Sequence, residues 1–382
     1  MPSLKGAVFP SEYQALRDDQ TGTVVHQLTS SSSINHHLYF LNSSFTPDGK
    51  SLIFTSYRSA HPQLYEVAFP TGPIRQLTVE EGMHAFSGCL SRDGKQVFFT
   101  RRGGVWSISR DTLQETCLGR FDDAQLGECS LSPSGEWIVT AIRQSSFSGI
   151  AFVPTIGREP PTVVRWPRTV IHPQFHPLDE NLVEFASDPA PRMHLLYRDS
   201  GKIECLHEHG NDEFVVHETF LGETGDIVFT VWPFSLGRFD LRNRRIQTLA
   251  RLNAWHISPN RNGNLILCDT NHPDVGIRLI DVSSGRHEVV CYPKSSCQGS
   301  QWRTSRYALP EDWARAAEEQ AAERGKTLSW MEMKTDTVYG PQWTHPHPSW
   351  SHDESKVVYT SDVSGHPQVY VAEIPEAMRK RR

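Results

Sequence analysis

The sequence predicts an all-β protein, a seven-bladed β-propeller with a short helical insertion between the sixth and seventh blades. Three observations predict it: a hairpin-turn pattern that recurs along the chain, aromatic residues at 10% with 26 glycines and 25 prolines spread evenly, and no linker dividing the 382 residues. Turn-dense, aromatic-rich chains of this kind are typical of long all-β single domains. We therefore expect one domain over residues 1–382.

The repeat consists of an extended run, a tight polar turn, and a run of β-branched and aromatic residues. It is clearest in SSFTPDGKSLIFTS, with Asp48-Gly49 at its turn, and in GCLSRDGKQVFFT, with Asp93-Gly94. Weaker copies turn at Ser134-Gly135, Asp179-Glu180, Thr224-Gly225, Asn262-Gly263 and Asp353-Glu354. Asp-Gly and Asn-Gly pairs supply the positive φ angles that two-residue hairpin turns need.

The spacing of these turns predicts the number of blades. Successive turns are 45, 41, 45, 45, 38 and 91 residues apart, and a four-stranded blade takes about 40–50 residues. Seven turns therefore predict seven blades, with an insertion in the longest step. The expected blades cover residues 36–80, 84–122, 126–167, 171–210, 214–252, 253–292 and 344–375. Residues 22–30 have no turn of their own and are expected to complete the last blade, because a closed ring leaves no sheet edge open.

The insertion, residues 293–340, has a different pattern. Its segment from Pro310 to Arg324 is rich in Ala and Glu, with Pro at the start and Gly325 just past the end. These are helix start and stop signals. Because the insertion leads directly into Gln342, we expect it on the same rim as the residues that follow. There it forms either a lid or wall over a cleft, or a helix packed on the outside.

Composition restricts the partners and the compartment. The net charge of −6 argues against nucleic acid as a partner. The seven cysteines form no CxxC pair, which excludes a zinc ribbon or a disulfide framework. No apolar run has the length of a signal peptide or a transmembrane helix. We expect a cytoplasmic protein without a membrane partner, and the oligomeric state stays open.

Five histidines stand six to eight residues before their hairpin turns. They are His172, His217, His256, His345 and His347. In a propeller the strand before each turn is the innermost, and it begins at one mouth of the central channel. A single histidine is more often part of the surface or the core than of a site. Four consecutive blades with histidine at the same level nevertheless predict a functional ring at the channel mouth.

The sharpest local motif is QWTHPHP, from Gln342 to Pro348. Two residues apart on a strand, His345 and His347 face the same side, so two imidazoles can hold one metal. Neutral imidazole suits manganese, iron, nickel, zinc or copper, and an amide oxygen from Gln342 favours a harder, octahedral ion. Together with His256 from the neighbouring blade, the motif predicts a divalent metal site.

The segment QWTHPHPSWSHDESKVVYTSDVSGHPQVYV resembles the last blade of the oligogalacturonate lyases, intracellular enzymes that complete pectin breakdown. FSGCLSRDGKQVFFT, HPQFHPLDENLVEFASDPAPRMHLLY, VVHETFLGETGDIVFTV and AWHISPNRNGNLILCD resemble other blades of that family, in the same order. The resemblance covers most of residues 20–292 and 340–375. Its specific part is the Gln-x-x-His-x-His cluster, because the turn repeats alone fit many propellers.

The resemblance implies roles for individual residues. It implies a divalent metal, manganese, bound by His256, Gln342, His345 and His347. It implies that His217, in the pair His217-Glu218, is the catalytic base. It implies that Arg192, in the pair Arg192-Met193, is a catalytic residue that binds the substrate. The reaction implied is cleavage of short oligogalacturonides, of the unsaturated digalacturonate type, by metal-assisted β-elimination that gives 4,5-unsaturated uronate monomers.

Two departures from the family concern the substrate. The insertion is longer than the family pattern, and the family's His-Arg pair in the first blade reads His36-His37, which removes a cation that could hold a uronate. We expect His172 and His37 to contact the substrate. Elimination on another uronate-containing oligosaccharide remains an alternative.

Two other classes of propeller are weighed against an enzyme. A WD40- or TolB-like interaction propeller would carry ordinary polar residues at the rim, where this chain concentrates imidazoles. A prolyl-oligopeptidase-like peptidase would need a G-x-S-x-G nucleophile elbow and a hydrolase domain. The sequence has no such motif, and we expect no hydrolase domain after residue 375.

Overall fold

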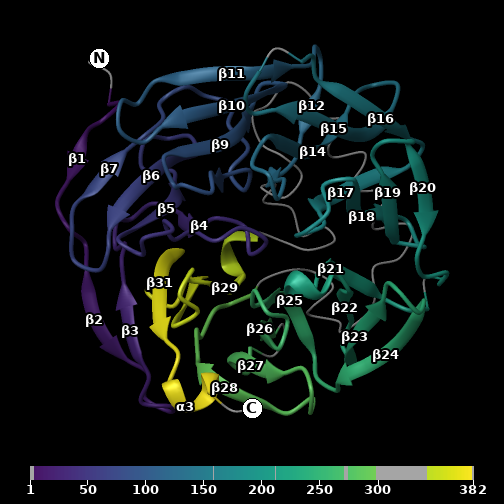
Figure 1. Ribbon diagram of the computed structural model, residues 1–382. Coiled ribbons are helices and arrows are strands. Elements are labelled where there is room, and N and C mark those ends of the chain that lie inside the picture. The colour runs from purple at the N-terminus through teal and green to yellow at the C-terminus, as the bar shows by residue number, and fades with distance from the viewer. Residues whose placement is uncertain (1–3, 158, 211, 271–273, 298–341, 381–382) are drawn as a thin grey trace. The chain divides into compact units, whose positions relative to one another are not determined.

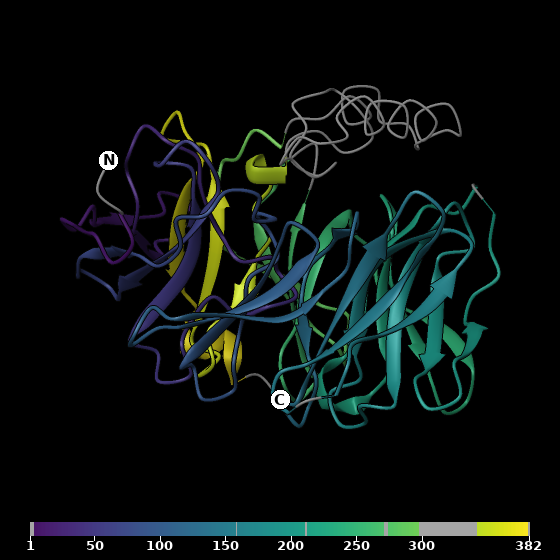
Figure 2. The same ribbon diagram turned by 90° about the horizontal axis from the view of Figure 1, so that it is seen from above.

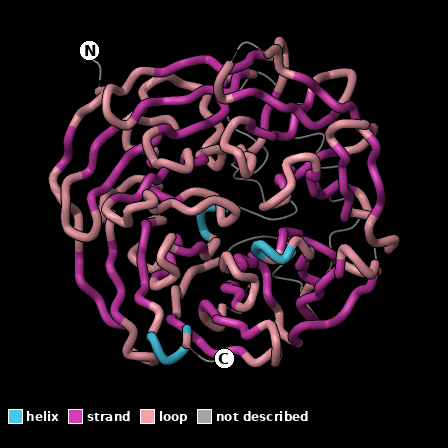
Figure 3. Tube along the Cα trace, in the orientation of Figure 1, coloured by secondary structure: helices cyan, strands magenta, loops and turns pink. Residues whose placement is uncertain are grey.

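The computed structural model describes residues 4–157, 159–210, 212–270, 274–297 and 342–380. Its regular structure is almost entirely strand (Figure 3). The helices in the described ranges are short: the 3-10 helices η1 (Gly222–Thr224) and η3 (Gln342–Thr344), and α3 (Glu376–Arg379). None of these described helices has the length and apolar character that crossing a membrane requires.

The chain divides into two compact units. The first consists of Met1–Ala85, Leu267–Ile280 and His287–Arg382, and the second of Phe86–Ile266 and Asp281–Arg286. Each sheet is built mainly from strands that follow one another in the sequence (Figure 1).

The first unit contains two five-stranded antiparallel sheets. One has the order β1-β7-β6-β5-β4: Val8–Phe9, Ile74–Gln76, Gln63–Ala68, Ser51–Ser56 and Asn35–His37. The other has the order β2-β3-β31-β30-β29: Gln14–Arg17, Val24–Gln27, Gln368–Glu373, Lys356–Ser361 and Ser349–Trp350. In the second sheet Val25 pairs with Ala372 and Gln27 with Tyr370. Strands from the beginning and the end of the chain therefore complete one sheet together.

The second unit contains four sheets, whose strands run in colour from blue to teal in Figure 2. The first is β8 to β11: Cys89–Leu90, Gln96–Arg101, Gly104–Ser109 and Glu115–Arg120. The next is β12 to β16: Gln125–Leu126, Ser130–Leu131, Trp137–Arg143, Ser148–Pro154 and Thr162–Trp166. Then come β17 to β20: Thr169–Phe175, Leu182–Asp188, Met193–Tyr197 and Lys202–Cys205. The last is β21 to β24: Val215–Phe220, Ile227–Val231, Ser235–Asp240 and Arg245–Ala250.

A seventh sheet, β25-β26-β27-β28, has strands assigned to both units. Its strands are Ala254–Pro259, Leu265–Thr270, Ile277–Asp281 and His287–Cys291. Seven hairpin-connected antiparallel sheets of four or five strands are the blades of a seven-bladed β-propeller, so the predicted fold class is confirmed. The predicted helix from Pro310 to Arg324 lies outside the described residues.

The hairpin turns differ from the predicted two-residue type. At Asp48-Gly49 the Thr46 and Ser51 backbones close the hairpin, because Thr46 N–H donates to the Ser51 carbonyl at 2.9 Å. Only Gly49 of that turn has a positive φ, of 68°. Asp48 instead accepts hydrogen bonds from the Thr46 hydroxyl at 2.6 Å and from Lys50 N–H at 3.1 Å. The aspartate therefore holds a four-residue loop closed through its carboxylate, and glycine alone supplies the left-handed backbone.

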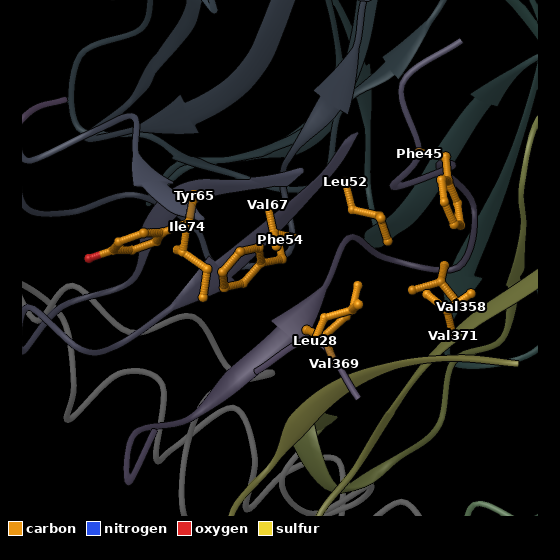
Figure 4. Close-up of a cluster of buried hydrophobic side chains, with 10 residues drawn as sticks. All are labelled: Leu28, Phe45, Leu52, Phe54, Tyr65, Val67, Ile74, Val358, Val369 and Val371. Atoms are coloured by element: carbon orange, nitrogen blue, oxygen red, sulfur yellow. The ribbon is translucent and has the colours of Figure 1, made fainter. Parts of the chain in front are cut away.

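Apolar side chains between neighbouring sheets form the core. In the first unit one such cluster joins strands β5 to β7 with β30 and β31 (Figure 4); its members are Leu28, Phe45, Leu52, Phe54, Tyr65, Val67, Ile74, Val358, Val369 and Val371. All ten are at most 2% exposed. Similar clusters lie between successive sheets of the second unit. The inner strands β17, β21 and β25 are almost entirely buried, so the polar side chains on them are the ones that point to a site.

Candidate metal centre and catalytic residues

The segment that carries the predicted metal ligands lies between η3 and β29 in the first unit. Its backbone folds back at once, because His345 N–H donates to the Gln342 carbonyl at 3.0 Å. His347 has a φ of 49°, in the left-handed region that few residues other than glycine, asparagine and aspartate adopt. His345 is 0% exposed and His347 is 2% exposed. The segment thus presents its imidazoles inside the protein from an irregular, closely held backbone.

Gln342 and His347 are in direct contact. His347 Nε2 donates to Gln342 Oε1 at 3.1 Å, and the rings of His345 and His347 are 5.8 Å apart. Two neighbouring donors on an octahedral ion with bonds of about 2.1 Å lie roughly 3 Å apart. The amide oxygen and the imidazole nitrogen therefore already have the separation of adjacent ligands, and this donor set fits a divalent metal.

The backbone and ring of His347 are held by several groups. Its backbone N–H donates to Asp269 Oδ2 at 3.0 Å. Asp269 lies on β26 and is 0% exposed. The Phe40 ring stacks on its imidazole at 6.1 Å, and the Tyr39 ring lies 5.2 Å away. Groups that hold a ligand side chain in one orientation strengthen metal binding, although they do not touch the metal themselves.

His37, predicted to contact the substrate, lies against this segment. His37 Nε2 donates to the His347 carbonyl at 2.6 Å, and the Thr360 hydroxyl donates to His37 Nδ1 at 2.8 Å. Both ring nitrogens are therefore bonded within the protein, and His37 holds the ligand segment in place. The adjacent His36 donates from Nδ1 to the His37 carbonyl at 2.9 Å, and burial lowers the pKa of His36 to about 4. His36 is consequently neutral at physiological pH.

The two ends of the insertion meet beside the ligand segment. The Ser295 hydroxyl donates to the Thr344 carbonyl at 2.5 Å, and Cys297 N–H donates to the same carbonyl at 3.2 Å. Asp362 accepts from Ser296 N–H at 2.8 Å. The chain therefore leaves for the insertion and returns from it next to His345, as connectivity predicts. The insertion beyond residue 297 lies outside the described residues.

Two other predicted histidines occupy β-bulges in the second unit. In β17 the pairing shifts between Ile171 and Gln174, and His172 lies in the shift with a φ of 51°. In β21 it shifts between Val216 and Thr219, and His217 lies there with a φ of 55°. A bulge adds one residue to a strand and re-aims its side chain, and such bulges are common next to active sites. The structure thus gives both histidines the same backbone geometry.

His217 packs against the neighbouring strand β25. Its ring lies 4.4 Å from the Trp255 ring and 4.4 Å from the His256 ring. His256 is 0% exposed, whereas His217 keeps 8% of its surface. The predicted base and the predicted ligand from the sixth blade are therefore adjacent within the second unit.

Arg192 lies in a buried cluster of carboxylates. Its Nε donates to Glu218 Oε1 at 3.0 Å and its Nη2 to Glu218 Oε2 at 3.4 Å, while Nη1 is bound by Asp188. Burial raises the pKa of Asp188, against the opposing effect of Arg192. Burial and the Glu218 charge also hold the pKa of Glu184 well above its usual range. Arg192 is therefore the cation of a buried acidic group, and two carboxylates orient its guanidinium.

Arg192→Leu is expected to lower the free energy of unfolding at pH 7 by about 3–5 kcal/mol, because it leaves buried carboxylates without their cation. Urea denaturation measures this. The loss should shrink toward pH 4, where the carboxyls take up protons and no longer need a positive neighbour. Arg238→Leu is the matched control: Arg238 pairs with Asp226 but its side chain is 29% exposed, so about 1 kcal/mol or less is expected. Equal losses in both variants would contradict the assignment.

Sequence reasoning missed several residues of these sites. Asp269, Asp188 and Glu184 carry no local signal, because their partners come from other strands. Glu128 did carry one: it stands six residues before Ser134 at its hairpin turn, the same offset as His256 from Asn262. Burial raises the pKa of Glu128 to about 7.

The structure brings the predicted site residues together in two groups. In the first unit Gln342, His345, His347 and His37 form one group. In the second unit His217 lies beside His256, and the residue after it, Glu218, binds Arg192. His172 shares the bulge geometry of His217 on the adjacent sheet.

Two family profiles match the chain. One, described as the TolB beta propeller domain, matches residues 18–182, and the other, described as oligogalacturonate lyase, matches residues 316–378. The second match includes the whole of the ligand segment. The first profile therefore matches the repeated propeller sheets, and the second matches the last blade, which carries the predicted metal ligands.

Similarity to known proteins extends over the full chain. An oligogalacturonate lyase of Dickeya dadantii is 22% identical over 98% of this chain and 99% of its own length. An oligogalacturonide lyase of Pectobacterium atrosepticum is 21% identical, with the same two coverages. A solved structure described as an oligogalacturonate lyase in complex with manganese superposes with a TM-score of 0.79 at 21% identity, covering 98% of this chain and 100% of the other. Over its whole length the chain is therefore similar to oligogalacturonate lyases.

Proposed function

We propose that this protein is a carbon–oxygen lyase that cleaves short oligogalacturonides by manganese-assisted β-elimination. The observation that carries the proposal is the buried donor pair of Gln342 and His347, at the spacing of adjacent metal ligands. Full-length similarity to oligogalacturonate lyases, one of them in complex with manganese, supports both the substrate class and the metal.

The metal would be held by Gln342, His345, His347 and His256. His256, His345 and His347 are all buried, and each can supply one ring nitrogen as a metal ligand. When bound, a divalent ion polarises the uronate carboxylate and makes the adjacent C5 proton more acidic, a Lewis-acid effect worth several kcal/mol.

His217 then removes the C5 proton. A positioned imidazole base contributes about 10²–10⁴-fold to the rate. The residue keeps 8% of its surface exposed. Arg192, whose guanidinium is oriented by Asp188 and Glu218, is the residue that we assign to binding the substrate. His172 is a further substrate contact, and His37 acts through the ligand segment.

The products of digalacturonate test the reaction class. Elimination splits it without water into one galacturonate and one uronate lighter by a water molecule, whereas hydrolysis gives two galacturonates. We expect the lighter product by mass spectrometry, only when manganese is restored after treatment with a chelator. Two galacturonates would indicate a hydrolase, and unchanged substrate would indicate a binding propeller.

We place this activity in the cytoplasm. All seven cysteines are free, as is usual in a reducing compartment. The partner that we assign to the metal centre in this compartment is a short oligogalacturonide.

A further inference from the structure

Three successive sheets of the second unit carry the same irregularity in their first strand. In the sheet of β17, the pairs Ile171–Ala186 and Gln174–Glu184 leave two residues opposite one. In the sheet of β21, Val216–Thr230 and Thr219–Val228 do the same. These shifts hold His172 and His217.

The preceding sheet has a bulge at the corresponding place. Leu126 pairs with Ile142 through β12, and Ser130 pairs with Val139 through β13, so three residues stand opposite two. Again one residue is extra. Glu128 is the middle one of the three, so it lies in a bulge as the two histidines do, without their positive φ.

The three bulged strands are neighbours. Phe175 N–H from β17 donates to the Ser130 hydroxyl of β13 at 3.4 Å. Gln174 Nε2 from β17 donates to the Glu218 carbonyl of β21 at 2.9 Å. The bulge residues themselves share one degree of burial: Glu128 and His172 are 7% exposed and His217 is 8% exposed.

The Glu128 carboxyl is prepared to carry a proton. Its Oε1 is buried and has no hydrogen-bond partner among the described residues. The next side chain, Cys129, belongs to the apolar cluster between the sheets. Burial raises the pKa of Glu128 to about 7, against a smaller opposing hydrogen bond from its own backbone. At neutral pH a large share of the molecules therefore holds Glu128 as a neutral acid.

We propose that Glu128 is the general acid that protonates the oxygen leaving C4 during elimination. The inference rests on the proposed lyase function. His217 takes the C5 proton, the C5–H electron pair forms the C4–C5 double bond, and the C4–O bond breaks with its electrons on oxygen. The proton of Glu128 moves to that oxygen, so a sugar hydroxyl leaves rather than an alkoxide. Glu128 ends as a carboxylate and His217 as an imidazolium, and exchange with water restores both.

A neutral acid suits this substrate for a second reason. Oligogalacturonides carry one carboxylate per sugar, and an ionised, desolvated glutamate beside them would repel these charges. A protonated carboxyl donates a hydrogen bond without that repulsion. Positioned acids contribute about 10²–10⁴-fold to such reactions.

Glu128→Gln tests the proposal, because the amide keeps the shape and the hydrogen-bond donor but cannot transfer a proton. On digalacturonate we expect kcat to fall about 100-fold or more with KM nearly unchanged. On a synthetic galacturonate carrying nitrophenol at O4, whose leaving group needs no proton, the variant should match the wild type. Glu128→Asp should recover part of the lost kcat on digalacturonate, because it restores an acid at shorter reach.

Asp226→Asn is the matched control, a buried carboxylate of the same unit that binds Arg238 outside the bulges; its kcat should stay at the wild-type level. Equal losses on both substrates at unchanged thermal stability would show that Glu128 has another role. Unchanged kcat on digalacturonate would overturn the proposal outright. The wild-type protein is assayed first. If it is inactive on both substrates, the lyase function itself is refuted, and the result says nothing against Glu128 in particular.

Discussion

His345→Ala is expected to lose both manganese and lyase activity while the propeller stays folded. His345 is fully buried in the irregular segment before β29 and lies outside the described strands, so its loss removes a ligand without breaking a described sheet. We expect turnover to fall about 1,000-fold, the rate equivalent of roughly 4 kcal/mol. Elemental analysis after incubation with manganese and desalting measures the metal, and a thermal melt measures the fold.

His366→Ala is the control for this result. It removes an exposed histidine from the turn between β30 and β31 of the same blade, and it should leave metal content and turnover unchanged. Stoichiometric manganese in His345→Ala would mean that the ligand set is wrong.

His217→Asn should abolish turnover but keep the metal. Asparagine tolerates the positive φ of this bulge better than alanine does, so the variant isolates the loss of the imidazole from backbone strain. Because a base acts in the transition state, we expect kcat to fall by about 10²–10⁴-fold with little change in KM. Steady-state kinetics on digalacturonate and metal analysis provide the two measurements.

His172→Asn is matched to it in backbone geometry, on the adjacent sheet. A substrate contact predicts a raised KM with kcat largely retained, the opposite pattern. If His217→Asn instead loses its manganese, His217 is a ligand through its contact with His256, and the base must lie elsewhere.

The number of blades follows from the sequence because each hairpin turn is a local event. Asp48-Gly49 and Asp93-Gly94 identify their turns within a few residues, and the spacing supplies the count. The conformation of these turns was predicted less well. The Asp48 side chain closes the loop by hydrogen bonds, which a residue pair alone does not reveal.

The site was partly predictable for a related reason. Counting back from each turn places His172 and His217 at one level, and the structure gives them one backbone geometry. The bulges themselves depend on pairing with a second strand, so a pattern of single residues does not show them. For the same reason the roles of Glu128, Asp188 and Asp269 became visible only when their neighbours in space were known.

The left-handed histidines have a consequence for engineering this protein. A non-glycine residue in a sparsely populated backbone region costs about 1–3 kcal/mol, and His172, His217 and His347 all have φ angles near 50°. A redesign that scores each position for stability alone would replace them with glycine or asparagine and gain on every substitution. The thermostable product would keep seven blades and lose its chemistry, so these three positions must be excluded from any such optimisation.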